Sequence, residues 1–237
     1  MNLNPKLLKC AIPYWIGGLI CFEVAIVIIY LGGVFIHREV YPPFDMDGFM
    51  TIPTLLQASI LFQMSLVYLG MFFFSRKLSE RPSPAFWFVQ SVLLFYVALD
   101  ELVKLHLGMG SSSWMPISGT KYWIGIYSFL IVAIAVFFFR DFKALWYGSR
   151  NLVILGLSGL VLALIGAFGV EIFKHIVLNR LLAKFFSERE VLSWVIEQVR
   201  VAFEEFFEMF GETLILYAVL LFVAKKIEQN SQGFLVK

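Results

Sequence analysis

The sequence contains an apolar stretch from Ile12 to Ile36 in which Glu23 is the only charged residue. A helix needs about 20 predominantly apolar residues to cross the hydrocarbon core of a bilayer, and this stretch is long enough. Although Lys6 and Lys9 precede it, the stretch is longer than the apolar region of a secretory signal and lacks an obvious cleavage site. We therefore predict an uncleaved transmembrane helix near the start of the chain.

Five further stretches have the length and apolar character of membrane-spanning helices. Polar connections that carry Gly, Pro or Ser separate them, as at 41–43, 81–84 and 108–113. The sequence thus predicts an all-α integral membrane bundle of about six transmembrane helices, forming a single domain over residues 1–237. The predicted spans are 12–36, 53–74, 85–103, 122–139, 152–173 and 201–223.

The composition supports this fold class. Of the 237 residues, 60% are hydrophobic and 15% are charged, whereas a soluble domain averages about 25% charged residues. The net charge of +2 gives no reason to expect nucleic acid, and the two cysteines imply no disulfide framework. As partners we expect membrane lipid and the subunits of a larger membrane complex, and no nucleic acid.

Small residues are frequent in the fifth stretch, among them Gly156, Gly159, Ala163 and Gly166. Small side chains let helix backbones approach closely in lipid. The pattern predicts that this helix packs tightly at the centre of the bundle.

The connection at 179–198 is neither short nor purely polar. Ser187 followed by Glu190 has the spacing of a capping box, and an apolar run from Val191 follows. This pattern predicts an amphipathic interfacial helix between spans five and six, lying at the membrane surface, or a long extension of span six.

Charge distribution predicts the orientation of the chain. If the N-terminus is cytoplasmic, more than half of the 19 Lys and Arg residues fall on that side. Because basic residues favour the cytoplasmic side, we predict that the N- and C-termini are both cytoplasmic. Most of the 17 acidic residues then fall on or near the opposite side; the exceptions are Glu23, Glu80, Asp141 and Glu228.

Acidic residues and histidines gather at the ends of three spans that reach the same face if the topology alternates. These spans are the third, the fifth and the sixth. Helical spacing places Glu171 and His175 on one face, and Glu205, Glu208 and Glu212 on one stripe. The candidate metal-ligating residues are Asp100, Glu101, His106, Glu171, His175, Glu205, Glu208 and Glu212.

The cost of buried charge favours a bound ion at this face. A charged side chain at the centre of a span costs roughly 2.5–3.5 kcal/mol, and neighbouring carboxylates repel unless they are protonated, paired or bound to cations. Carboxylates with imidazoles suit iron, manganese or zinc. The predicted cofactor is therefore a di-iron, manganese or zinc centre. The Glu171-x-x-x-His175 spacing differs from the Glu-x-x-His of di-iron bundles, so the match lies in ligand type.

Two motifs carry a resemblance. Asp100-Glu101-x4-His106 and Glu204-Glu205-x2-Glu208-x2-Gly211 resemble motifs of uncharacterised bacterial multi-pass membrane proteins. In those proteins the first motif usually reads DE-x4-HE, and Leu107 replaces the final Glu here. The resemblance covers spans three and six only, and it implies a shared intramembrane polar site.

From these features the sequence predicts a membrane-embedded metalloprotein with a carboxylate/histidine site near the extracytoplasmic face. If it is an enzyme, a di-metal oxidoreductase acting on a lipid or quinone-like substrate fits these ligands best. One alternative is a cation or proton transporter. Another is a noncatalytic subunit of a larger membrane complex, with haem or pigment held by His106 or His175.

Glu23 lies apart from these residues, near the middle of the first span. We expect a protonated structural acid there or, alternatively, a proton or cation relay. Glutamines of spans two and three are the candidate hydrogen-bond partners: Gln57, Gln63 and Gln90.

Overall fold

The computed structural model describes residues 5–76, 81–105, 121–185 and 190–235, and these residues form helices and no strand. Five helices in the described ranges are long and apolar enough to cross a membrane. These helices confirm the prediction of an all-helical fold. Their length and apolar composition agree with the prediction of a multi-pass membrane protein.

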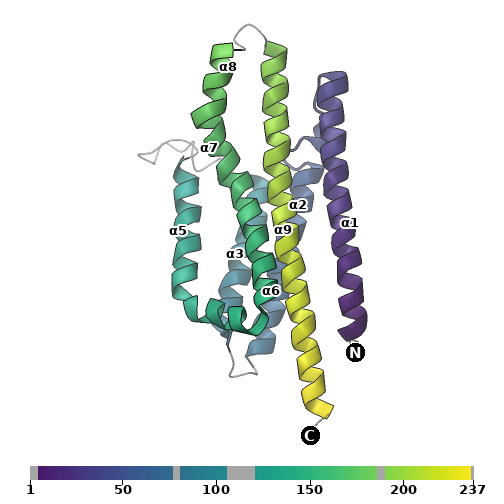
Figure 1. The fold of residues 1–237 in the computed structure, drawn as a ribbon, viewed down its shortest axis with the longest axis vertical. Helices are drawn as coiled ribbons and strands as arrows, with labels where there is room; N and C mark the ends of the chain where they lie inside the picture. The colour runs from purple at the N-terminus through teal and green to yellow at the C-terminus, as the bar shows by residue number, and fades with distance from the viewer. Residues whose placement is uncertain (1–4, 77–80, 106–120, 186–189, 236–237) are drawn as a thin grey trace. The chain divides into compact units, whose positions relative to one another are not determined.

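Figure 1 shows the described helices, coloured in chain order. Two helices contain π-helical turns, which are the segments η1, η3 and η4. The bounds are α1 Pro5–Gly32, η1 Gly33–His37, η2 Pro42–Phe44, α2 Ile52–Ser75, α3 Pro84–Val103, α5 Lys121–Phe137, α6 Phe139–Leu164, η3 Ile165–Val170, α7 Glu171–Phe173, η4 Lys174–Leu178, α8 Asn179–Phe185 and α9 Glu190–Leu235.

Two predicted elements differ in extent from the observed helices. The fourth predicted span, 122–139, corresponds to α5, whose 17 residues are fewer than those of the five long helices, so the count of six stays a prediction. The 179–198 segment is divided between α8 and the first turns of α9. Residues 190–198 therefore extend the sixth span, as one alternative expected, and their location at the membrane surface stays a prediction.

The described residues divide into two compact units. The first comprises residues 1–57 and 155–237, and the second comprises residues 58–154. Both boundaries fall inside continuous helices, α2 and α6.

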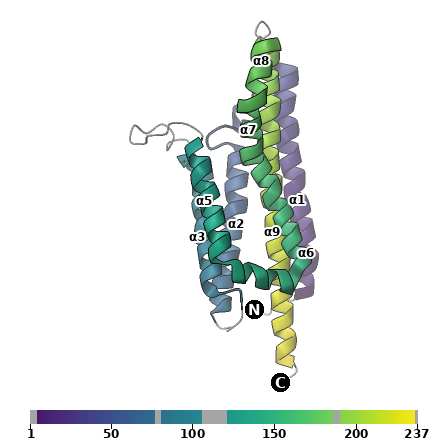
Figure 2. The ribbon, with the colours of Figure 1, turned by 60° about the vertical axis from the view of Figure 1, so that its left-hand side comes forward.

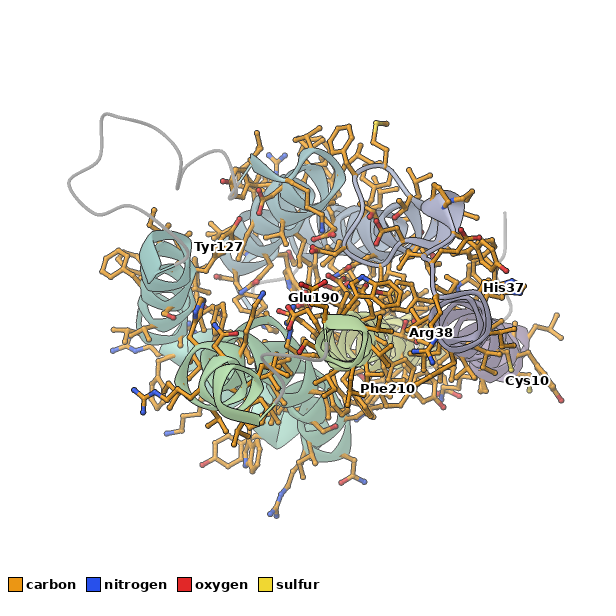
Figure 3. The ribbon with its side chains drawn as sticks, turned by 90° about the horizontal axis from the view of Figure 1, so that it is seen from above. Cys10, His37, Arg38, Tyr127, Glu190 and Phe210 are labelled. Carbon is orange, nitrogen blue, oxygen red and sulfur yellow. The ribbon has the colours of Figure 1, made fainter. Side chains whose placement is uncertain are left out.

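In the first unit, α1 and α9 run side by side (Figures 1 and 2). Ile26, Met209 and Leu216 are fully buried. The start of α1 and the end of α9 lie at the same end of this unit, where Lys9 forms an ion pair with Glu228. Cys10 is exposed on the side of α1 that faces away from α9 (Figure 3).

Glycines bring α6 and α9 into backbone contact within the first unit. A Cβ added at Gly159 would lie 2.5 Å from the carbonyl oxygen of Gly211, and a Cβ at Gly211 would lie 2.5 Å from that of Gly159. Such a separation is shorter than any real Cβ contact, so only glycine fits at both positions. The close approach agrees with the small-residue pattern of the fifth predicted span.

In the second unit, reciprocal hydrogen bonds join α2 to α3, because each hydroxyl of Ser65 and Ser91 donates to the other residue's carbonyl at 2.8 Å. The Ser83 hydroxyl caps α3 by accepting from the Phe86 N–H. Asp141 in turn accepts from the N–H of Ser83 at 2.7 Å. Helix α6 changes direction at Ser149, whose φ of −158° and ψ of 56° are not helical.

Replacing Gly211 tests the contact between α6 and α9. The Gly211→Ala variant should lose about 1–3 kcal/mol of stability, because the added methyl group meets backbone atoms that cannot move independently. The matched control is Gly18→Ala on α1, where nothing lies within 4 Å of the added Cβ. The control should be neutral or more stable by up to about 1 kcal/mol, since alanine is the better helix former. Thermal unfolding in detergent measures both, and equal stabilities would contradict the close contact.

Candidate functional site

Buried polar side chains line the face of α9 that belongs to the core of the first unit. Glu205, Glu212 and Thr213 are buried on this face together with the apolar Met209 and Leu216. Their spacing is that of one stripe of a helix. A stripe that usually carries only apolar side chains therefore carries carboxyl groups here.

Gln57 links two of the carboxyl groups. Its Nε2 lies 3.3 Å from a carboxyl oxygen of Glu208 and 3.3 Å from a carboxyl oxygen of Glu212. The amide has two N–H donors and can donate one to each carboxyl group. Gln57 is 2% exposed. We refer to Gln57, Glu208 and Glu212 as the carboxyl–amide cluster.

Glu23 of α1 is fully buried at the contact with α9. The hydroxyl of Thr213, next in sequence to Glu212, donates to its Oε1. Oε2 has no hydrogen-bond partner among the described residues. The expectation of a glutamine partner for Glu23 is wrong for Gln57, whose amide donates to α9 instead.

The π-helical segment η3 lies directly against the cluster. A Cβ added at Gly166 would lie 2.8 Å from Cγ of Glu208 and 2.7 Å from the carbonyl oxygen of Glu204. The absence of a side chain at Gly166 therefore leaves room for the Glu208 side chain. Single π-helical turns inside α-helices are frequent at functional sites.

An ion-pair chain lies next to the cluster, toward the start of α9. Lys174 of η4 lies 2.9 Å from Glu197, and Arg200 lies 2.9 Å from the same carboxylate. Arg200 also pairs with Glu204. The four charges alternate in sign and sum to zero, which reduces the cost of holding them inside the protein.

Tyr30 of α1 makes a further polar contact with α9, next to the ion-pair chain. Its hydroxyl donates to the side-chain oxygen of Gln198. Apart from the ion pair of Lys9 with Glu228, the polar contacts described between α9 and its neighbours reach from Glu197 to Thr213, about 24 Å along the helix axis.

The predicted ligands that the structure describes are divided between the two units. Glu205, Glu208 and Glu212 lie together on α9, and His175 lies in η4, where it is exposed. Asp100 and Glu101 belong to the second unit. His106 and the side chain of Glu171 lie outside the described residues.

The two acids of the second unit have partners there. Asp100 is buried and accepts a 2.5 Å hydrogen bond from the Tyr127 hydroxyl. Glu101 pairs with Lys104, the residue that follows α3, at 2.7 Å. Sequence reasoning did not identify Tyr127 as a partner, because its helix is distant in sequence and nothing in its spacing points to Asp100.

Within residues 5–76, 81–105, 121–185 and 190–235, no group of three or more His, Cys, Asp or Glu side chains is placed to hold a metal ion. The predicted di-metal centre, with iron, manganese or zinc, stays a prediction, as does a haem or pigment on His106 or His175.

Comparison with known proteins identifies the family. Residues 19–224 match the model of a domain of unknown function, DUF8692. The chain belongs to the DUF8692 family. No curated protein and no solved structure matches it. The DUF8692 segment includes Glu23, the whole carboxyl–amide cluster and the ion-pair chain.

Replacing Arg200 tests the ion-pair chain. The Arg200 side chain is 8% exposed and that of Lys174 is 29% exposed. Arg200→Met should therefore cost about 3 kcal/mol of stability, because a partly buried carboxylate is left without its cation. Lys174→Met should cost less than about 1 kcal/mol, since water screens that pair.

The control for both is Arg180→Met, which removes the same charge from an exposed position on α8. Chemical unfolding in detergent micelles measures the three variants. Equal losses for Arg200→Met and Arg180→Met would show that the ion-pair chain contributes nothing specific.

Proposed function

We propose that this chain is a proton- or cation-coupled membrane carrier whose ion-binding site is the carboxyl–amide cluster. The observation that carries the proposal is the position of Gln57, with its amide nitrogen 3.3 Å from carboxyl oxygens of both Glu208 and Glu212. Ionisable groups within membrane-spanning helices are functional by default.

The chemistry of the cluster favours binding of a cation or a proton. Glu208 and Glu212 are one helical turn apart, so two negative charges there would repel each other. Gln57 can donate a hydrogen bond to each carboxyl group but adds no positive charge. A proton, or a hard cation that prefers oxygen ligands, would offset this repulsion.

Glu23 is the next carboxyl group along the contact between α1 and α9. Its hydrogen bond from Thr213 places it one residue beyond Glu212 along α9. We propose that Glu23 accepts a proton during the transport cycle, since a buried carboxylate is costly unless it is neutralised.

The extent of the polar contacts favours a carrier over an open channel. Beyond Thr213, the buried side chains described between α1 and α9 are apolar, including Ile16, Leu19 and Phe222. This region continues to the ion pair of Lys9 with Glu228. A polar route that ends part-way requires a conformational change to release the ion on the other side.

A second candidate function is the predicted metalloprotein, a di-metal oxidoreductase acting on a lipid or quinone-like substrate. The stripe of Glu205, Glu208 and Glu212 on α9 supports it, because clustered carboxylates are suitable ligands for iron and manganese. The two functions use overlapping residues, so the content of transition metal separates them.

Proton flux into liposomes tests the carrier. Protein reconstituted with an entrapped pH-sensitive dye should acidify the lumen when a pH gradient or an opposing sodium or potassium gradient is applied. Glu208→Gln and Glu212→Gln should each reduce this flux to the level of protein-free liposomes, because the amide cannot exchange a proton. The matched control is Glu190→Gln, an exposed residue at the start of α9 that should leave the flux unchanged.

Metal analysis completes the test. Mass spectrometry of detergent-purified wild-type protein is compared with the Glu208→Ala/His175→Ala variant. A stoichiometric transition metal that is lost in this variant would contradict the carrier function and support the di-metal centre. Folded protein with neither metal nor flux would overturn both, and would leave the role of a noncatalytic subunit of a membrane complex.

A further inference from the structure

Residues 139–150 form a separate structural feature at the start of α6. Because the helix changes direction at Ser149, the turns before it run across the end of α5 and not parallel to it (Figures 1 and 2). All of these residues belong to the second unit. The sequence pattern places residues 140–151 in a connection between two predicted spans, and it predicts an interfacial helix or an extension of span six at 179–198.

The basic side chains of this segment are exposed and its one acid is not. Arg140, Lys143 and Arg150 are exposed, whereas Asp141 is 3% exposed. Asp141 accepts hydrogen bonds from the N–H and the hydroxyl of Ser83. Its charge is therefore held inside the unit, and the outer surface of the segment is positively charged.

Aromatic side chains accompany the basic ones. Phe139 is 64% exposed and Tyr147 is 76% exposed. The Lys143 ammonium lies 5.8 Å from the centre of the Tyr147 ring, and the Arg150 guanidinium lies 5.3 Å from that of Trp146. Aromatic rings combined with Lys and Arg are typical of segments that lie at the level of lipid headgroups.

The residue after α2 is a further exposed cation of the same unit. Arg76 is exposed, with its guanidinium 5.6 Å from the centre of the Phe72 ring. Arg81, whose side chain is 49% exposed, pairs with Asp141. Among the described residues 76, 81–84 and 137–154, Asp141 is the only Asp or Glu. We call residues 139–150 the basic–aromatic face.

We infer that the basic–aromatic face binds the headgroups of anionic phospholipids and holds residues 139–148 in the plane of the bilayer surface. The exposed cations match the charge of the headgroup phosphates. The exposed Phe139 and Tyr147 favour lipid over an acidic protein, because both rings can enter the boundary between headgroups and acyl chains. This inference does not depend on the proposed transport function.

Lipid titration tests this inference on the full-length protein. Protein in detergent is titrated with fluorescent phosphatidylglycerol and, separately, with fluorescent phosphatidylcholine. The Arg140→Gln/Lys143→Gln variant should bind phosphatidylglycerol roughly 25-fold more weakly than wild type, since each charge contributes roughly fivefold. Binding of phosphatidylcholine should not change.

The matched control is Arg38→Gln/Arg180→Gln, which removes two exposed cations from the first unit and should leave binding of phosphatidylglycerol unchanged. Equal binding by wild type and the Arg140→Gln/Lys143→Gln variant, or equal weakening in the control, would overturn the inference.

A second measurement does not depend on removing charge. With Cys10 and Cys21 replaced by Ala, an environment-sensitive dye is attached to a Tyr147→Cys variant in nanodiscs that contain phosphatidylglycerol. Emission typical of the headgroup region is the expected result. Emission typical of bulk water would show that this segment does not lie on the membrane and would overturn the inference independently.

Discussion

A carboxylate inside a bilayer is costly unless another group neutralises or solvates it, and the first unit is organised around this constraint. Hydrogen-bond partners for the buried acids come from other helices. Gln57 of α2 donates to Glu208 and Glu212, and Thr213 of α9 donates to Glu23 of α1. Within the first unit, these contacts select a particular rotation of α9 against α1 and the start of α2, because a rotated α9 would leave its carboxyl groups facing lipid.

Close backbone packing makes the polar arrangement sterically feasible. In lipid there is no hydrophobic driving force between helices, so their association depends on packing and interhelical hydrogen bonds. Gly159 and Gly211 allow α6 to contact α9, and Gly166 allows η3 to lie against Glu208. The same glycines therefore serve both the packing of the helices and the placement of the carboxyl–amide cluster.

In the second unit, the buried acids and the exposed basic residues have different roles. Asp100 and Asp141 are buried and are held by hydrogen bonds from Tyr127 and Ser83. The basic residues of 139–150 remain exposed beside aromatic rings. Asp100 and Asp141 join helices of this unit to one another, whereas the exposed cations of 139–150 are available to an anionic partner.

Sequence by itself determined the fold class and the position of the long helices. Stretches of about 20 apolar residues have few stable alternatives to membrane-spanning helices, because every backbone polar group must be satisfied within the segment. The stripe of Glu205, Glu208 and Glu212 was predictable for a related reason, since helical periodicity depends only on local spacing. Only the tertiary structure decided the partners of these residues. Glu23 meets Thr213, and Gln57 bridges Glu208 and Glu212, through contacts between residues more than 150 positions apart, which depend on helix packing that local spacing does not encode.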